Sequence, residues 1–403
     1  MGFLPFLSPR LRLFLSADIV GSTAYKQQLA SSPTRKEMDR VATQPEKLGG
    51  HFDSSMPSWL TPIANFYRAI DRNYAAAWHQ YVAHAQSIKW PTGPAPGLWK
   101  GNGDEVIYAK ELHDYREAFA GVYLWIQAVH QYRRVLRKQF PSLDVKATAW
   151  LSGFPLMNTE VIFYRQRPAI DEMDSGDDVF YNYYLLEQYY APDGNSDQMT
   201  IDYIGPSIDT GFRLSSYSTP RKFVISIDLM YMLSCAPRPP GYFSDGLVYR
   251  YDGRHQFRGV LGGNPYPVFW IDMLHNDDLL KEEDKLNGPN SPDKDHINGF
   301  CEKFIESQEG YIIKPFIITD GDGRFSKVPD QLLEKLRRLS EDWPKRKERH
   351  EIEVRSLKGE EAPARKLAAA PDDAAIAKFT VTSRPDHGTR TRRRKPARTA
   401  PKK

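Results

Sequence analysis

Cysteine is scarce in this sequence, and long hydrophobic runs do not occur. The 403 residues include only Cys235 and Cys301, which lie far apart and lack the spacing of metal ligands. A disulfide framework and a cysteine-based zinc site are therefore not expected, and a reducing, cytoplasmic setting fits best. Because no run of about 18 apolar residues is found, we expect no membrane span. The apolar N-terminus lacks a basic leader, which makes it a poor signal peptide.

Two common motifs of phosphate and metal chemistry are missing as well. The sequence contains no G-x-x-x-x-G-K-[S/T] loop, in which backbone amides cradle phosphates. It also contains no H-E-x-x-H pattern, which places two histidines on one helix face. A nucleotide site in this chain would have to use metal ions and arginine instead.

The composition is that of a folded, enzyme-sized chain. Hydrophobic residues make up 40% and aromatic residues 12%, whereas disordered chains contain few aromatics. The net charge of +4 is concentrated at the C-terminus, because residues 387–403 hold eight Lys or Arg and no acid. Such arms can bind nucleic acid by releasing counterions. This one has no aromatic or helical pattern, so we expect a solvated arm and no nucleic-acid partner.

The order of expected elements places one large body before an extension. Strands and helices alternate over residues 8–273 without a strict strand-helix-strand rhythm. This favours an α+β sandwich with a mixed, partly antiparallel sheet flanked by helices. Residues 274–343 look like an appended C-terminal region with helices of its own. Residues 344–403 thin into charge, alanine and proline, which predicts a disordered basic tail.

Two long helices are predicted inside the body. Apolar residues recur at three- and four-residue spacing over 66–82 and again over 111–139. Pro91 ends the first pattern and Pro141 ends the second, because proline cannot continue a helix. A shorter helix is predicted over 206–216.

The most informative feature is a pair of carboxylates at the ends of hydrophobic strands. Asp18 closes an apolar stretch where a strand meets a turn. Asp104 directly follows Asn102-Gly103, a favoured hairpin turn with both φ angles positive, within a hairpin predicted over 98–108. Rigid strand ends of this kind present oxygen ligands to hard cations. Two such ends can share a pair of ions over a phosphate ester.

Both stretches resemble motifs of the class III nucleotide cyclase catalytic domain. In that family the first strand ends in an aspartate followed by hydrophobic-x-Gly-Ser/Phe-Thr, and residues 18–23 match it. The family's hairpin carries Lys-x-x-Gly-Asp, which residues 100–104 match. The resemblance covers residues 8–272 and implies a class III cyclase-like sandwich.

A third motif falls in the family's order. The family has an aspartate, a glycine three residues later, and then an asparagine and an arginine four residues apart on a helix. Asp202, Gly205, Asp209 and Arg213 fall in this register. Asp209 departs from the asparagine, and a carboxylate about 5 Å from a triphosphate would cost about 3 kcal/mol at an effective dielectric constant of about 20. Either the register slips here or the ribose is held differently.

The resemblance implies cyclisation of a nucleoside triphosphate. In the family, the ribose 3′-hydroxyl attacks the α-phosphate and pyrophosphate leaves. Asp18, Asp104 and the backbone carbonyl of Ile19 are implied to hold two divalent cations, Mn²⁺ or Mg²⁺. Arg213 is implied to meet the charge that develops on the α-phosphoryl oxygens. Asp209 takes the place of the family's second catalytic side chain.

The resemblance also implies a partner subunit and a pair of base-reading residues. Arg213 is expected to lie opposite the metal site, which implies a head-to-tail-like homodimer. Its two composite sites would combine the aspartates of one subunit with the arginine of the other. In purine-specific members, the residues that match Lys100 and Asp202 read the base edge, and both side chains are present here.

Within the family, the chain looks most similar to bacterial anti-phage pyrimidine cyclases of the Pycsar type. The likeness rests on the opening residues 16–23 and on a single cyclase domain without a sensor. It implies UTP or CTP as substrate, with UTP favoured, and cyclic UMP or CMP as a messenger for a separate effector. Residue spacing does not separate uracil from cytosine. Two alternatives stay open: a purine (ATP or GTP) cyclase, and a non-catalytic cyclase-like module that senses a nucleotide.

Overall fold

The structure of the protein is a computed structural model that describes residues 3–31, 59–166, 177–194, 196–243, 246–286, 292–319 and 323–357. The chain divides into two compact units, Met1–Glu351 and Ile352–Lys403. The described sheets and helices belong to the first unit, apart from the end of the last helix. The first unit contains residues 274–351 together with the body that precedes them.

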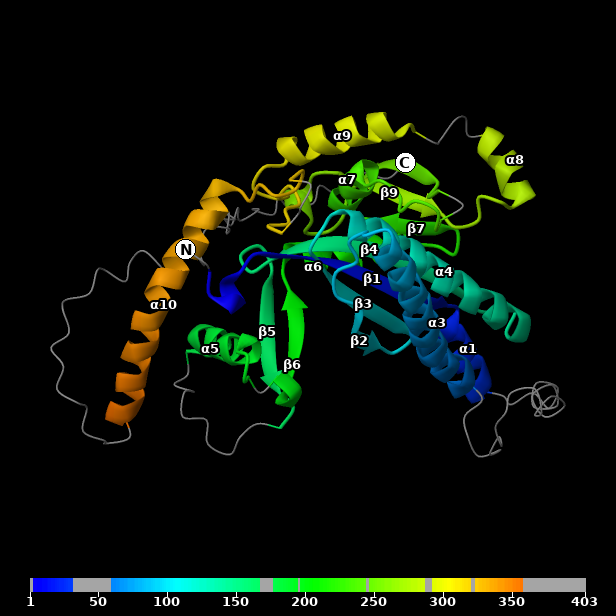
Figure 1. Ribbon diagram of the computed structural model, residues 1–403. Coiled ribbons are helices and arrows are strands. Elements are labelled where there is room, and N and C mark those ends of the chain that lie inside the picture. Colours follow the sequence, from blue (N-terminus) through cyan, green and yellow to red (C-terminus); the bar gives the residue numbers. More distant parts are fainter. Residues whose placement is uncertain are drawn as a thin grey trace, which may run out of the picture. The chain divides into compact units, whose positions relative to one another are not determined.

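A seven-stranded sheet forms the centre of the first unit, in the order β2-β3-β1-β4-β7-β9-β8 (Figure 1). β4 and β7 run parallel, and the other neighbouring strands of this sheet pair antiparallel. The mixed, partly antiparallel sheet of the predicted α+β class is therefore confirmed. The strands are β1 (Arg10–Val20), β2 (Gly97–Asn102), β3 (Glu105–Leu112), β4 (Asp144–Phe154), β7 (Lys222–Ile225), β8 (Tyr249–His255) and β9 (Tyr266–Asp272).

Helices flank this sheet, and a two-stranded sheet of β5 and β6 lies beside it (Figure 1). The helices and the two further strands are α1 (Ser22–Ser31), α3 (Leu60–Ser87), α4 (Arg116–Gln139), β5 (Thr159–Tyr164), α5 (Asp178–Tyr190), β6 (Met199–Ile204), α6 (Pro206–Ser215), α7 (Ile227–Cys235), α8 (Asp278–Leu286), α9 (Lys294–Ser307) and α10 (Asp330–Leu357). Both predicted long helices are present, as α3 and α4.

The central strand β1 is buried on both faces because successive side chains alternate between two cores. Leu13, Leu15 and Ala17 belong to the main hydrophobic core, to which α3 and α4 contribute buried side chains as well. Phe14 points to the opposite face, where its ring stacks on that of Trp150 with 5.4 Å between centroids. The predicted metal-site residue Asp18 falls on this second face, in register with Phe14.

Helix α6 covers part of the second face at very close range. Gly211 of α6 lies against the indole of Trp150, and a Cβ added to this glycine would come within 2.2 Å of the ring atom Cδ2. Only a residue without a side chain allows this approach. The helix that carries Asp209 and Arg213 is therefore held directly against β4.

Two predicted boundaries were wrong. Helix α4 begins at Arg116 rather than at residue 111, because β3 continues its pairing with β1 as far as Leu112. Helix α10 continues to Leu357, beyond the residue 344 at which the disordered tail was predicted to begin. Charged side chains three or four residues apart can stabilise a helix whose composition is not apolar. The prediction relied on composition and therefore placed the start of the tail too early. The rest of the tail, residues 358–403, lies outside the described residues.

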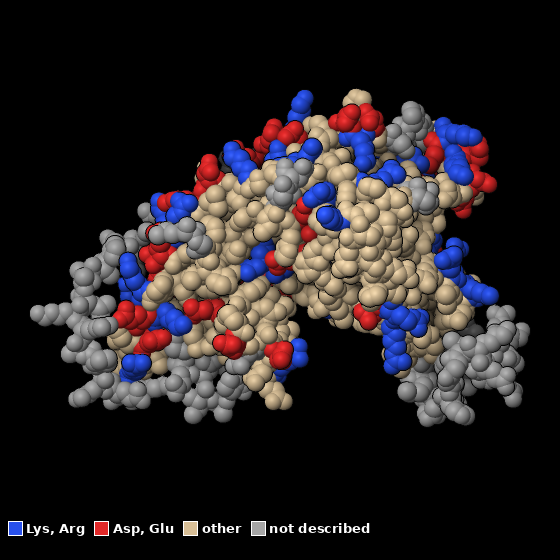
Figure 2. Space-filling model, viewed as in Figure 1, with Lys and Arg blue, Asp and Glu red and all other residues tan. Residues whose placement is uncertain are grey.

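The surface carries charges of both signs. On the face shown in Figure 2, Lys and Arg side chains alternate with Asp and Glu over α8 and α9, whereas the middle of this face is largely uncharged. None of the described helices combines the length and the apolarity that a bilayer crossing requires.

The contact between Gly211 and Trp150 gives a stability prediction. Gly211→Ala should lower the free energy of unfolding by about 1–3 kcal/mol, because the new methyl group overpacks against the indole. Gly299→Ala in α9 is the matched control, since no described atom beyond its own turn of helix lies within 4 Å of its added Cβ. The control should raise stability by about 0.5–1 kcal/mol through helix propensity. Urea unfolding followed by circular dichroism measures both, and equal shifts would contradict the close packing of α6.

Candidate functional site

Asp18 and Asp104 are brought together at one end of the central strands. Asp18 of β1 pairs with Glu105, the first residue of β3. Asp104 is the residue just before Glu105, in the turn from β2 to β3. The backbone N–H of Ile19 donates to the carbonyl oxygen of Asp104 at 3.1 Å. This bond extends the β1–β3 hydrogen bonding by one residue into the turn, and it holds the two aspartates beside each other.

The turn that holds Asp104 differs by one residue from the predicted turn. Asn102 pairs with Glu105, so the two turn residues are Gly103 and Asp104. Gly103 has a φ of 69°, and Asn102 is not among the residues with positive φ. Glycine at the first central position is the pattern of a type II′ turn, whereas Asn-Gly suits type I′. Asp104 thus lies within the turn instead of following it.

Each aspartate has a lysine nearby. Nζ of Lys146, on β4, lies 3.2 Å from Oδ2 of Asp18. Nζ of Lys26, on α1, lies 3.8 Å from Oδ1 of Asp104, and the Ser22 hydroxyl donates to the same carboxylate. The four charged side chains are 24% to 32% exposed, so solvent reaches the group.

The surroundings of Asp18 disfavour its ionised form. Burial raises the pKa of Asp18, and the negative charge of Asp104 raises it further. Lys146 lowers this pKa without cancelling the effect of burial. A cation placed between the two aspartates would therefore stabilise the ionised form of Asp18.

Glu105 is a third carboxylate at this site, and the sequence interpretation missed it. Its Oε1 accepts a hydrogen bond of 2.5 Å from the Ser16 hydroxyl. Burial raises the pKa of Glu105, and the charge of Asp18 contributes to the same shift. Glu105 and Asp18 are direct cross-strand partners. The signal in the sequence was the adjacent acid in Asp104-Glu105, which only strand register places beside Asp18.

The donor set suits a hard divalent cation. Asp18, Asp104 and the carbonyl of Ile19 supply oxygen atoms, the ligands preferred by Mg²⁺ and Mn²⁺. Over the described ranges, no cluster of three or more His, Cys, Asp or Glu side chains is arranged to hold a metal ion. Mg²⁺ is usually bound by one or two carboxylates plus phosphate oxygens and water, so a two-aspartate site fits a cation that arrives with a phosphate substrate.

The predicted base-reading residues Lys100 and Asp202 are also brought together. Nζ of Lys100 donates to Oδ1 of Asp202 at 3.0 Å, and Nε1 of Trp99 donates to the same oxygen at 3.0 Å. The ammonium group of Lys100 also lies 4.0 Å from the centroid of the Trp99 ring. Each side chain of the ion pair is 37% exposed. An aromatic wall therefore borders one side of this polar pair.

Asp209 and Arg213 lie on α6, one turn apart and exposed to solvent. Neither side chain makes a hydrogen bond or ion pair within the described part of the chain, so the structure does not join them to Asp18 or Asp104. The C-terminal end of α6 does come near Asp18, because Nζ of Lys146, which pairs with Asp18, also donates to the carbonyl oxygen of Ser215 at 3.4 Å. The roles of Asp209 and Arg213 stay predictions.

Comparisons with known proteins give matches among solved structures alone. No protein-family model matches the sequence, and no curated protein matches it. The adenylyl cyclase CyaB from P. aeruginosa is similar over 66% of this chain and 94% of its own, with 14% identity and a TM-score of 0.37. The guanylate cyclase domain of RhGC from Catenaria anguillulae, solved with GTP, covers 66% and 97%, with 11% identity and a TM-score of 0.34. The guanylyl cyclase Cya2 covers 68% and 94%, with 12% identity and a TM-score of 0.33. Likeness at this level does not assign an activity.

The lysine beside Asp18 leads to a binding prediction. Lys146→Met should tighten Mn²⁺ binding by about two- to fivefold, because it removes a cation that competes for Asp18. Lys222→Met is the matched control, since Lys222 is also a strand lysine paired with an aspartate, Asp252, outside this site. Calorimetric titration with Mn²⁺ alone measures both variants. Equal affinity in Lys146→Met and wild type would show that Lys146 does not compete with the ion.

Proposed function

We propose that the protein is a nucleotide cyclase that converts a pyrimidine nucleoside triphosphate to its 3′,5′-cyclic monophosphate and pyrophosphate, with UTP favoured over CTP. The observation that carries the proposal is the apposition of Asp18 and Asp104, fixed by the bond from Ile19 to the Asp104 carbonyl. The sequence motifs alone single out the same two residues. Their convergence at adjacent strand ends is what a phosphate-binding metal site requires.

The reaction forms one bond and breaks one bond at the α-phosphorus. The ribose 3′-hydroxyl gives its proton to solvent and its oxygen adds to phosphorus, the bond to the oxygen bridging to the β-phosphate breaks, and pyrophosphate leaves. Two divalent cations, when bound, would make the 3′-hydroxyl a better nucleophile and would offset charge on the leaving group. Asp18, Asp104 and the Ile19 carbonyl would hold them. Arg213 would donate to the equatorial phosphoryl oxygens, a task for which its planar, always charged side chain is suited.

The surroundings of Asp202 support a pyrimidine base. Trp99 lies between three aromatic rings, with its centroid 5.1 Å from that of Tyr203, 5.2 Å from Phe14 and 6.3 Å from Phe212. Its indole N–H already occupies Oδ1 of Asp202. The bulky Trp99 side chain, held at the base-reading pair by these contacts, would favour the smaller ring of a pyrimidine over that of a purine.

The isolation of Arg213 supports a composite site in a homodimer. Its side chain is exposed and unpaired within the described residues, whereas the metal-site aspartates already have partners in their own chain. A head-to-tail arrangement of two chains would bring this arginine to the aspartates of the other subunit. In the cell, the cyclic product would act as a messenger for a separate effector in anti-phage defence.

The activity is tested with purified protein and each of the four ribonucleoside triphosphates, in Mn²⁺ or in Mg²⁺. Wild type should release a cyclic pyrimidine nucleotide, identified by mass and retention time. Asp18→Ala and Asp104→Ala should each reduce product at least about a hundredfold while the melting temperature stays within a few degrees. Binding of a triphosphate without product from wild type would instead support a nucleotide-sensing module, and a purine product would support a purine cyclase.

Base selection is tested at Trp99. Trp99→Leu should raise kcat/KM for ATP and GTP relative to UTP by about tenfold or more, because it opens the wall beside Asp202. Trp99→Phe is the matched control, since it keeps a ring and removes the donor to Asp202. Competition between UTP and ATP in one reaction measures the ratio. An unchanged ratio in Trp99→Leu would show that this side chain does not exclude purines.

The composite site is tested by mixing two inactive variants. Asp104→Ala and Arg213→Ala should each be inactive alone, and their mixed dimers should contain one intact site. An equimolar mixture that exchanges subunits should recover about a quarter of wild-type turnover, because half of the dimers are mixed and each has one working site. No recovery, with exchange demonstrated by mass spectrometry of tagged chains, would place Arg213 in the same subunit's site or outside it.

A further inference from the structure

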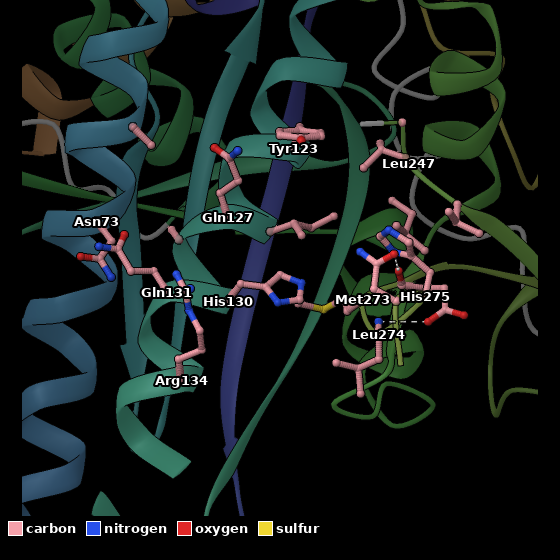
Figure 3. A pocket seen from close by; sticks show the side chains of 18 of the residues that line it. Asn73, Tyr123, Gln127, His130, Gln131, Arg134, Leu247, Met273, Leu274 and His275 are labelled. Atoms are coloured by element: carbon pink, nitrogen blue, oxygen red, sulfur yellow. Dashed lines mark hydrogen bonds between the residues drawn. The ribbon is translucent and has the colours of Figure 1, made fainter. Parts of the chain in front are cut away.

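A separate cleft of about 1100 Å³ opens on the side of the molecule formed by α3 and α4. Its other wall comes from the segments that flank β8 and β9, around residues 246–248 and 271–277 (Figure 3). None of the residues assigned to the metal or base-binding site lines it. Large clefts with a few converging polar groups are where proteins bind small molecules.

The charged groups that line this cleft leave it with excess positive charge. Arg72 and Arg134 have no ion-pair partner over the described ranges, and both line the cleft. Asp272 also lines it, but its buried carboxylate is neutralised by Arg221 at 2.9 Å and Arg250 at 3.4 Å. The side chain of Asp277 is engaged by the backbone N–H groups at the start of α8.

His130 is the histidine of α4 that lines the cleft. Its imidazole extends from α4 across the cleft toward Met273 and His275 (Figure 3). Burial lowers the pKa of His130 to about 4, and Arg133, His275 and Arg134 contribute to the shift. The Nδ1 of His275 is 3.0 Å from the carbonyl oxygen of Asp272, so Nδ1 carries the proton that this carbonyl accepts. The cations Arg133 and Arg134 therefore approach His130 from its own helix, and the His275 ring approaches it from the loop after β9.

The side chains that line the cleft are apolar toward one end and polar or charged toward the other. Tyr123 and Leu247 lie toward one end, whereas His130, Gln131 and Arg134 lie toward the other (Figure 3). The first group offers an aromatic and aliphatic surface. The second offers side-chain N–H donors and positive charge, the combination that binds phosphate oxygens. A ligand that matches both ends has an apolar ring joined to an anionic group.

We propose that this cleft is a second ligand site, which binds a small aromatic phosphate ester with its ring against Tyr123 and Leu247 and its phosphate at Arg134 and His130. Arg72 and Arg134, which have no ion-pair partner within the described residues, match the double negative charge of a phosphate monoester better than the single charge of a carboxylate. The neutral imidazole of His130 can add a hydrogen bond to a phosphate oxygen. The proposal does not depend on cyclase activity, because the cleft shares no residue with that site.

Phenyl phosphate is the probe, titrated calorimetrically into the full chain without divalent cations. It should bind more tightly than inorganic phosphate, which lacks the ring, and than benzoate, which carries one charge. Arg134→Gln should weaken binding about tenfold or more, as expected for a lost charge-assisted hydrogen bond. Arg68→Gln, an exposed α3 residue outside the cleft lining, should leave affinity unchanged. Equal weakening by both variants would overturn the proposal.

Two further measurements keep the result specific to the cleft. Phenyl phosphate should raise the pKa of His130 from about 4, followed by NMR of its ring protons, because the phosphate offsets the surrounding cations. Asp104→Ala should bind phenyl phosphate as wild type does, since Asp104 lies outside the cleft. If the pKa of His130 did not change on binding, or if Asp104→Ala no longer bound phenyl phosphate, the probe would be bound elsewhere and the proposal would be refuted.

Discussion

The pairing of β1 with β3 is the constraint on which the candidate active site depends. The register aligns Asp18 with Glu105 and ends in the bond from Ile19 to the Asp104 carbonyl. A slip of one residue would turn Asp18 toward the main core and Ala17 toward the site, because side chains alternate along a strand. The main core prevents such a slip, since it already buries Leu13, Leu15 and Ala17 on one face. Hydrophobic packing thus positions two carboxylates that repel each other.

The repulsion between Asp18 and Asp104 favours binding of a cation beside them. Lys146 lowers the pKa of Asp18, yet burial and, to a smaller extent, the charge of Asp104 keep this pKa raised. The partial exposure of these side chains lets a hydrated ion compete with the lysines. In the proposed function, a metal ion bound to the triphosphate would replace the lysine ammonium groups beside the two aspartates. Lys146 also contacts the end of α6, so one side chain touches both Asp18 and the helix that carries Arg213.

Helix α4 contacts both the strand of the candidate active site and the second cleft. Its Trp125 is fully buried, and the indole N–H donates to the carbonyl oxygen of Ser16 at 3.2 Å, two residues before Asp18. Residues on the same helix, among them Tyr123, Gln127 and His130, form a wall of the second cleft. One rigid element therefore supports β1 beside Asp18 and lines the proposed site for an anion.

Local patterns predicted much of the architecture. The period of apolar residues gave α3 and the body of α4, and the alternation of strands and helices gave the mixed sheet. The start of α4 could not be found in this way, because residues 111 and 112 fit a helix pattern while their backbone groups pair with β1. The β2–β3 turn was predicted one residue too early, because two turn types that contain glycine fit the same sequence. The pairing of Asn102 with Glu105 determines which of them forms.

By itself, the sequence determined which residue types were available at the site: Asp18 and Asp104 at strand ends, Lys100 before a turn, and Asp202 on a later strand. Residue types and their spacing along the chain are local properties, so the sequence alone is enough to identify them. The tertiary structure alone decided that Lys100 meets Asp202, that Lys146 and Glu105 join Asp18, and that Arg134 and His130 share a cleft with residues 271–277. These contacts join segments far apart in the chain, and only strand register and helix packing bring such segments together.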